Sequence, residues 1–435
     1  MHQTYDVLRE YVLGEEPVAF QIISDQKEAF EGRRGQVNYE DPHFSVSLPV
    51  FAIHGNHDDP TREGGNDALA ALDLLSITNF VNYFGKADKV DDVTIKPILM
   101  RKGTTNLALY GLGNIRDERL NRMWTKKKVK FLRPSEAEGR DTFFNILVLH
   151  QNRAEGRGRK NAIFESMIPE WMDVVIWGHE HECQPSFAES LHGRFRVLQV
   201  GSTVATSLVD GEAQPKHLAV LELREQQFRL QTYRLKSVRP FVTEELRLDD
   251  EDYNLDPEDV RVETQIDKLL EDTVKGCIER ARRERQEALL GDPDTQPPPN
   301  RLCTMQEPNQ VLCRVKVDRL GFQTLNNQRF GARFVGDVAN PSDILLWCQR
   351  RRVVETPAAK GASSSSRAAR VGGALALPVP PDSDELNVED LVADQLHSSD
   401  KKLKLLKVRF RFSIQWYQRA CSAVSLPVQT KAGDL

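Results

Sequence analysis

The chain has 435 residues, of which 40% are apolar and 28% are charged. A chain of this length and composition can bury a substantial core and has room for two domains, so intrinsic disorder is excluded as its general state. Its formal net charge of −5 gives no overall signature of nucleic-acid binding, so any contact with DNA would have to come from a local basic surface.

Cysteine usage and the absence of targeting patterns indicate the compartment. Six cysteines are scattered without a C-x-x-C pair, which argues against a disulfide framework or a zinc knuckle and favours a reducing environment. No apolar run approaches membrane-spanning length, and the first residues lack the charged-then-apolar order of a signal peptide. We therefore expect an intracellular protein.

The first half of the chain alternates between helical and strand patterns. Residues 4–13 are expected to form a short helix that ends at Gly14. Residues 67–84 carry a broad apolar stripe at helical spacing and predict a second helix, whose stripe faces either the core or a partner. Strands are predicted at residues 18–23, 48–53, 107–110, 145–149, 174–178 and 195–200, the last ending at Gly201.

A second region begins near residue 238. Residues 263–290 predict a long amphipathic helix, and residues 311–317 predict a strand. The apolar residues of the helix recur at helical spacing and are Ile266, Leu269, Leu270, Val274, Ile278 and Ala281. Four arginines near its end have two interpretations, a solvated face favoured near a helix C-terminus or a contact with DNA phosphates. They are Arg280, Arg282, Arg283 and Arg285.

Three separated apolar strands run directly into histidines. The residues that follow these strands are Asn56, His57, Asp58, His150, His179, Glu180 and His181. Ligands that emerge where buried strands end are how layered α/β enzymes build a site. A single histidine at a strand end is usually a structural residue, as we expect for His54, but three such motifs in one chain favour a common functional site.

The residue types indicate half of a two-metal phosphoesterase site. Phosphodiester hydrolysis requires an activated water, neutralised phosphoryl oxygens and a proton for the leaving oxygen, and two divalent ions do the first two. Asn56 offers a carbonyl oxygen to a hard ion, His57 is the candidate general acid, and Asp58 is the candidate residue that orients it. An extended backbone would place His179 and His181 on one side, within reach of the same metal centre.

These motifs resemble the calcineurin-like metallophosphoesterases, and within them the eukaryotic nucleases of double-strand-break repair. The likeness runs from about residue 7 to residue 235, and it resumes at residues 333–341 and 388–392. It implies an α/β fold, a two-sheet sandwich flanked by helices, followed by a smaller α+β DNA-capping domain. The implied divisions are a nuclease domain at residues 1–237, a capping domain at 238–354, a flexible linker at 355–382 and a C-terminal segment at 383–435.

The resemblance also implies an activity and a set of roles. It implies a Mn²⁺-dependent DNA nuclease, with 3′-to-5′ exonuclease and single-strand endonuclease activity, that acts in the nucleus in DNA repair, homologous recombination and meiosis. Asn56, His150 and His179 would bind one of two Mn²⁺ ions, His181 would bind the other, and His57 would act on the leaving group. The implied partners are DNA, an SMC-like ATPase, nibrin and a second copy of the chain, which would contact residues 67–84; no membrane is implied.

The chain also departs from the family pattern. The family's opening D-x-H and G-D motifs, which supply aspartate ligands, would lie upstream of Met1, so the domain is expected to be incomplete at its N-terminus and to lack its opening strands. Asp41 and His43 have the letters of D-x-H but follow no buried strand, so we expect a chance match. Residues 302–310 look like an insertion. After about residue 406 the sequence no longer follows the family pattern. This last segment has two interpretations, a DNA-contacting tail or an unrelated terminus.

Two functional hypotheses follow. The first is a metal-dependent DNA nuclease, and the second is a truncated, non-catalytic form that serves as a DNA- or partner-binding scaffold. Three histidines and an asparagine supply no carboxylate to offset roughly four positive charges of two divalent ions. Such nitrogen-rich donors favour zinc or copper over manganese, so the chain as written is expected to be a poor nuclease. A generic phosphomonoesterase is less favoured, because the second region resembles a DNA-capping domain.

Overall fold

The computed structural model describes residues 2–30, 35–60, 69–87, 91–153, 158–290 and 310–349, which all belong to one compact unit. The predicted linker at residues 355–382 and the C-terminal segment at 383–435 lie outside the described residues, as does nearly all of the predicted insertion at 302–310. Among the described residues, no helix combines the length and the apolar character needed to cross a membrane.

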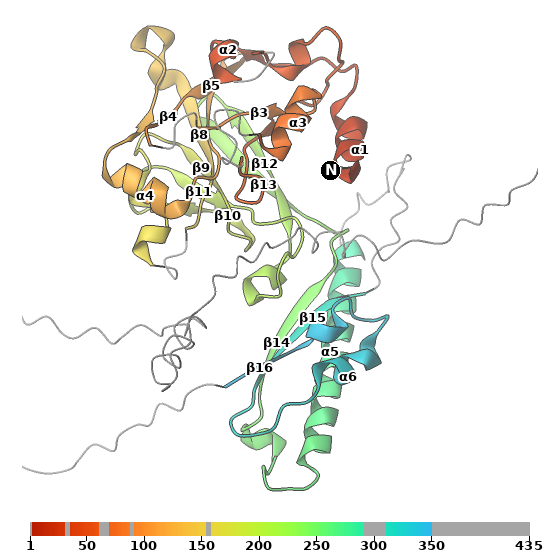
Figure 1. Ribbon diagram of the computed structural model, residues 1–435. Coiled ribbons are helices and arrows are strands. Elements are labelled where there is room, and N and C mark those ends of the chain that lie inside the picture. The colour runs from red at the N-terminus through yellow and green to blue at the C-terminus, as the bar shows by residue number, and fades with distance from the viewer. Residues whose placement is uncertain are drawn as a thin grey trace, which may run out of the picture. The chain divides into compact units, whose positions relative to one another are not determined.

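The first part of the chain is organised around a mixed sheet with the strand order β1-β5-β6-β8-β9-β11-β10. Figure 1 labels β5, β8, β9, β10 and β11 of this sheet. Its strands are β1 (Gln21–Ile22), β5 (Pro97–Lys102), β6 (Thr105–Leu112), β8 (Phe143–His150), β9 (Val174–Gly178), β10 (Gln184–Glu189) and β11 (Arg196–Gln199). Strands β6, β8, β9 and β11 pair in parallel, whereas β1, β5 and β10 pair antiparallel at the margins. The C-terminal ends of the four parallel strands therefore meet at one edge of the sheet.

Both faces of this sheet are buried, as the apolar strands predicted. In β8, Phe144 and Ile146 face a cluster that includes Phe228, while Leu147 and Leu149 face the opposite cluster. The first face is covered by the hairpin of β12 (His217–Arg224) and β13 (Gln227–Arg234). The second is covered by α4 (Asp117–Thr125) and by the parallel pair β4 (Val93–Ile95) and β7 (Val129–Phe131). The predicted sandwich flanked by helices is confirmed.

The segment before the sheet corrects two predictions. Helix α1 (His2–Val12) agrees with the expected first helix, but the strand expected at residues 18–23 is only β1. The helix expected at residues 67–84 is wrong in its second half, because α3 (Ala71–Ile77) ends early and the chain continues into β3 (Asn82–Tyr83). The physical reason lies at Asn79, whose φ of 61° ends the helix and whose buried side chain donates to Asp41 Oδ2 at 2.8 Å.

The remaining elements complete the described chain. Strand β2 (Phe51–Ala52) pairs in parallel with β3, and α2 (Gln26–Ala29) follows β1. The 3₁₀ turns are η1 (Asn38–Glu40), η3 (Glu136–Glu138), η4 (Arg140–Thr142), η6 (Arg159–Asn161), η7 (Glu165–Met167), η8 (Asp210–Ala213), η9 (Glu251–Tyr253), η10 (Ala332–Phe334) and η11 (Pro341–Asp343).

The second part of the chain is a helix packed on a small parallel sheet. Strands β14 (Phe241–Arg247), β15 (Leu312–Asp318) and β16 (Leu345–Cys348) form the sheet, next to which Figure 1 shows the long α5 (Val262–Leu290) and the short α6 (Asn327–Gly331). Five of the six predicted apolar residues of α5 are buried and Leu269 is half-buried, which confirms the predicted stripe. Two of the arginines form ion pairs, Arg280 with Glu244 at 2.7 Å and Arg282 with Asp337 at 2.6 Å.

Candidate metal centre

The edge where the parallel strands end brings together two of the predicted histidines. His150 is the last residue of β8, and it pairs in register with Gly178, which precedes His179. The two imidazole rings contact each other edge to face, with centroids 5.3 Å apart. A Cβ on Gly55 would lie 2.8 Å from His150 Cε1, so glycine is needed for the 55–58 turn to approach this ring.

His54 anchors the turn that carries Asn56 and His57. Its ring is 4% exposed and hydrogen-bonds through Nε2 to the Asn114 carbonyl oxygen at 3.0 Å and through Nδ1 to the Tyr83 hydroxyl at 2.8 Å. Burial lowers the pKa of His54, which favours the neutral ring in these contacts. The structural role expected for His54 agrees with this environment.

The turn itself places Asn56 against His150 and leaves His57 and Asp58 exposed. His150 Nε2 lies 3.0 Å from Asn56 Oδ1, and the Asp58 backbone N–H donates to the Gly55 carbonyl at 3.1 Å. Asp58 and His57 are both described residues, and no hydrogen bond joins them. The predicted role of Asp58 in orienting His57 therefore stays a prediction. The Asp58 carboxylate instead contributes to the electrostatic environment of His54.

The electrostatics of His150 reflect a cluster of histidines. Burial lowers the pKa of His150 to about 4, and the neighbouring His179, His54, His181 and His57 lower it as well. A neutral imidazole is the form that binds metal ions, because a protonated nitrogen has no lone pair to offer. Histidines from all three motifs therefore lie close enough to His150 to interact with it electrostatically.

His179 has an unusual backbone and an unsatisfied ring nitrogen. Its φ is +86°, so the extended backbone predicted at this position is wrong, and the strand ends at Gly178 instead. His179 and His181 nevertheless both lower the pKa of His150, and the His179 ring contacts that of His150. His179 Nδ1 is buried and has no hydrogen-bond partner among the described residues. Buried polar atoms of this kind are rare and commonly mark an absent water or ion.

His181 contacts a segment that sequence reasoning missed. Its Nδ1 hydrogen-bonds to Thr206 Oγ1 and lies 3.5 Å from Glu212 Oε1. Burial raises the pKa of Glu212, but hydrogen bonds from Ser207 and Thr206 outweigh it, so the pKa lies below the usual value. The only sequence signal for this segment was the predicted strand at residues 195–200, which ends at Gly201. In the structure this strand is β11, and it ends at the same edge of the sheet as β8 and β9.

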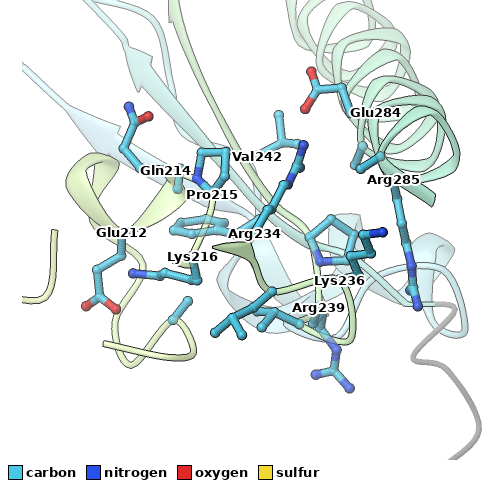
Figure 2. Close-up of a pocket in the computed structure, with 18 residues that line it drawn as sticks. Glu212, Gln214, Pro215, Lys216, Arg234, Lys236, Arg239, Val242, Glu284 and Arg285 are labelled. Atoms are coloured by element: carbon cyan, nitrogen blue, oxygen red, sulfur yellow. The ribbon is translucent and has the colours of Figure 1, made fainter. Parts of the chain in front are cut away.

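A small pocket lies beside this segment. Its volume is about 100 Å³, and basic side chains outnumber acidic ones in its lining (Figure 2). The charged residues that line it are Glu212, Lys216, Arg234, Lys236, Arg239, Glu284 and Arg285. Such a lining forms a local basic surface on a chain whose net charge is negative.

Asp41 is buried in a loop, and His43 is exposed beside it. Asp41 is 5% exposed, and its carboxylate accepts hydrogen bonds from the Asn79 side chain at 2.8 Å and from the His43 backbone N–H at 2.9 Å. Through these contacts the Asp41 carboxylate stabilises its loop. This agrees with the prediction that Asp41 and His43 match the D-x-H letters by chance.

Comparison with known families agrees with this geometry. Residues 26–183 match the calcineurin-like phosphoesterase family, and residues 228–410 match the Mre11 DNA-binding presumed domain. The chain therefore contains a calcineurin-like phosphoesterase domain followed by an Mre11 DNA-binding domain. Both parts of the predicted resemblance are confirmed.

Particular relatives are double-strand break repair proteins named MRE11. The chain is 44% identical to that of Arabidopsis thaliana, over 93% of this chain and 51% of the relative. It is 46% identical to that of Oryza sativa subsp. japonica, over 81% of this chain and 48% of the relative. It is 37% identical to that of Homo sapiens, over 93% of this chain and 53% of the relative. The chain thus spans about half the length of the curated relatives it matches.

The family implies divalent metal ions, and the described residues fit part of such a site. The orphaned Nδ1 of His179, the adjacent His150 and the Asn56 carbonyl oxygen are suitable donors for a borderline or hard divalent ion. Within the described ranges, however, no group of three or more His, Cys, Asp or Glu side chains is arranged to hold a metal ion. The donors converge without forming a closed ligand cage.

Proposed function

We propose that this chain is a divalent-metal-dependent phosphodiesterase that acts on DNA, with a role in the repair of double-strand breaks. The observation that carries the proposal is the contact of His150 with Asn56 and with the ring of His179, at the ends of β8 and β9. The phosphoesterase domain and the Mre11 DNA-binding domain support the reaction type and the substrate class.

The residues have distinct roles in this proposal. Asn56, His150 and His179 would bind one metal ion, and His181 would bind a second. When bound, such ions neutralise phosphoryl oxygens and lower the pKa of a bound water. His57 is the general acid, since it is exposed at the tip of the turn and near enough to His150 to affect its pKa. Asp58 follows His57 and would orient it.

The finer parts of the proposal follow the resemblance. The metal is Mn²⁺, two ions are used, and the activities are 3′-to-5′ exonuclease and single-strand endonuclease, in the nucleus and in meiosis as well as in somatic repair. The proposed domain division is at residue 237. An SMC-like ATPase and nibrin are the proposed protein partners, and a second copy of the chain would contact α3, where Leu74 and Ile77 are 58% and 50% exposed.

DNA contact is proposed for basic residues that lie along α5 and the pocket of Figure 2. Arg285 and Arg239 line this pocket together with Lys236, so phosphate groups would meet several cations there. Arg280 and Arg282 form ion pairs with Glu244 and Asp337 and do not line this pocket. Binding through such residues should weaken steeply as the salt concentration rises.

A second candidate function is a scaffold that binds DNA or partners without cleaving. The observation that favours it is the absence, within the described ranges, of a closed His, Cys, Asp and Glu ligand set. The two candidates differ in one outcome, since only the enzyme converts bound DNA to shorter products.

The experiment that tests the proposal incubates the full chain with end-labelled single-stranded DNA at increasing Mn²⁺, with Zn²⁺ in parallel. We expect slow metal-dependent cleavage, because the proposed ligands include no carboxylate. The rate should fall at least ~100-fold in His150→Ala and stay unchanged in His192→Ala, an exposed histidine outside the site. DNA binding without cleavage in every metal would overturn the enzyme in favour of the scaffold. Cleavage that His150→Ala leaves intact would overturn the assigned site.

A further inference from the structure

His181 is linked to a buried carboxylate through a single hydroxyl group. Its Nδ1 hydrogen-bonds to Thr206 Oγ1, which lies 3.1 Å from Glu212 Oε1 and 3.3 Å from Glu212 Oε2. Glu212 is only 3% exposed, whereas Thr206 and the His181 side chain are open to solvent. The carboxylate end of this chain of contacts is therefore shielded from bulk water, where hydrogen bonds are strong and unpaired groups are costly.

The hydrogen bonds around Glu212 fix the direction of this chain of contacts. The backbone N–H of Thr206 donates to Oε2 at 2.6 Å, and the backbone N–H of Ser207 donates to Oε1 at 3.0 Å. Because a backbone N–H can only donate, both carboxylate oxygens are acceptors. The Thr206 hydroxyl therefore donates its one proton to Glu212 and has lone pairs left to accept the Nδ1–H of His181.

The consequence concerns the other nitrogen of the ring. A neutral imidazole with its proton on Nδ1 has an unprotonated Nε2, which is the form that binds a metal ion. Metal-binding histidines commonly donate their second N–H to a carboxylate or another acceptor, which fixes the tautomer and the ring orientation. Here the acceptor is a hydroxyl whose own direction is set by the carboxylate behind it.

The same segment also holds the backbone of His181. Lys216 Nζ donates to the His181 carbonyl oxygen at 3.0 Å and to Ser202 Oγ at 3.2 Å. A Cβ on Gly201 would lie 2.6 Å from that carbonyl, so the segment packs directly on it. Ring and main chain are thus both fixed by residues 201–216.

We propose that Glu212 is a positioning residue that acts through Thr206 to keep His181 in the Nδ1–H tautomer, with Nε2 available for a metal ion. The functional meaning rests on the proposed metal centre, whereas the tautomer is a property of the metal-free chain. The Glu212–Thr206 pair is distinct from the metal ligands, because neither residue would contact the ion.

The test measures the His181 tautomer in the metal-free full chain by ¹⁵N NMR of histidine-labelled protein, with His181→Gln to assign the signal. We expect the Nδ1–H tautomer in the wild type. In Glu212→Gln the amide can donate to the Thr206 hydroxyl, which is then free to donate to His181 Nδ1, so the Nε2–H tautomer should appear. An Nε2–H tautomer in the wild type, or an unchanged tautomer in Glu212→Gln, would overturn the proposal.

Two further comparisons separate positioning from loss of structure. Thr206→Ser keeps the hydroxyl and should retain the tautomer, whereas Thr206→Val should lose it; equal behaviour of this pair would contradict the proposal even if Glu212→Gln fails to fold. Asp173→Asn is the matched control, because this carboxylate accepts Asn145 donors at 2.7 and 3.0 Å at the opposite end of β9. It should leave the His181 signal unchanged.

A Mn²⁺ titration of the same variants separates this proposal from the proposed function. We expect Glu212→Gln to weaken Mn²⁺ binding by roughly 10- to 100-fold and Asp173→Asn to leave it unchanged. A wild type with the predicted tautomer relay but no Mn²⁺ binding would refute the metal centre and retain the relay. Equal Mn²⁺ affinity of the wild type and Glu212→Gln would refute the positioning role of Glu212 and retain the metal centre.

Discussion

At the scale of single residues, the site combines backbone strain with a nitrogen that lacks a partner. His179 has a φ of +86°, a region that costs a non-glycine residue about 1–3 kcal/mol, and its Nδ1 is buried without a hydrogen bond. Both features reduce the stability of the metal-free fold. Such costs are expected where the geometry serves binding rather than packing.

The strain at His179 can be tested by replacing it with two small residues. Glycine adopts positive φ freely and alanine does not, so we expect His179→Gly to be more stable than His179→Ala by about 1 kcal/mol. Urea denaturation of the metal-free full chain, followed by circular dichroism, measures the difference. Equal stabilities, or a more stable alanine variant, would show that the backbone at this position is not strained.

His57 allows a test of chemistry apart from metal binding. Because it is assigned to the proton of the leaving group, His57→Asn should slow DNA cleavage by roughly 10²-fold or more while leaving the metal affinity nearly unchanged. Calorimetric titration with Mn²⁺ and the cleavage rate are measured on the same preparation. Loss of metal binding in this variant would instead make His57 a ligand.

At the scale of elements, strand ends position the site and one long helix stabilises the second part of the chain. In α5, Leu270 is fully buried against the β14-β15-β16 sheet, whereas Gly276 is exposed and a Cβ there would meet no atom within 4 Å. The same helix therefore offers two substitutions to alanine with opposite expected signs.

We expect Leu270→Ala to lower the free energy of unfolding by about 2–5 kcal/mol, because it removes buried methyl groups and leaves a cavity. Gly276→Ala should raise it by about 0.4–1 kcal/mol, because alanine loses less backbone entropy in a helix. Urea denaturation of the full chain compares both variants with the wild type. A neutral Leu270→Ala would show that α5 does not contribute to a cooperative core.

The sequence predicted those parts of the site that follow from local patterns. Buried strands that end in histidines are visible as apolar runs, so the convergence of His150 and His179 could be foreseen from parallel pairing. The partner of His181 could not, because Glu212 and Thr206 lie in an irregular segment whose path depends on tertiary contacts. The early end of α3 depends in the same way on a hydrogen bond between Asn79 and the distant Asp41.

At the scale of the whole molecule, the chain couples a phosphoesterase domain to an Mre11 DNA-binding domain and spans about half the length of its curated relatives. Because its net charge is −5, the proposed DNA binding depends on local basic surface such as the pocket of Figure 2. The proposal that the chain binds divalent metal ions is the central claim. Both the proposed chemistry of the histidines and the role of the His181 tautomer depend on such ions.

The most direct test of that claim is a titration of the full chain with Mn²⁺, in which electron paramagnetic resonance measures the free ion. We expect saturable binding by the wild type, the same affinity in the exposed control His192→Ala, and an affinity at least ~10-fold weaker in His179→Ala, which removes the orphaned donor. No binding by the wild type, or equal binding by the wild type and His179→Ala, would contradict the account.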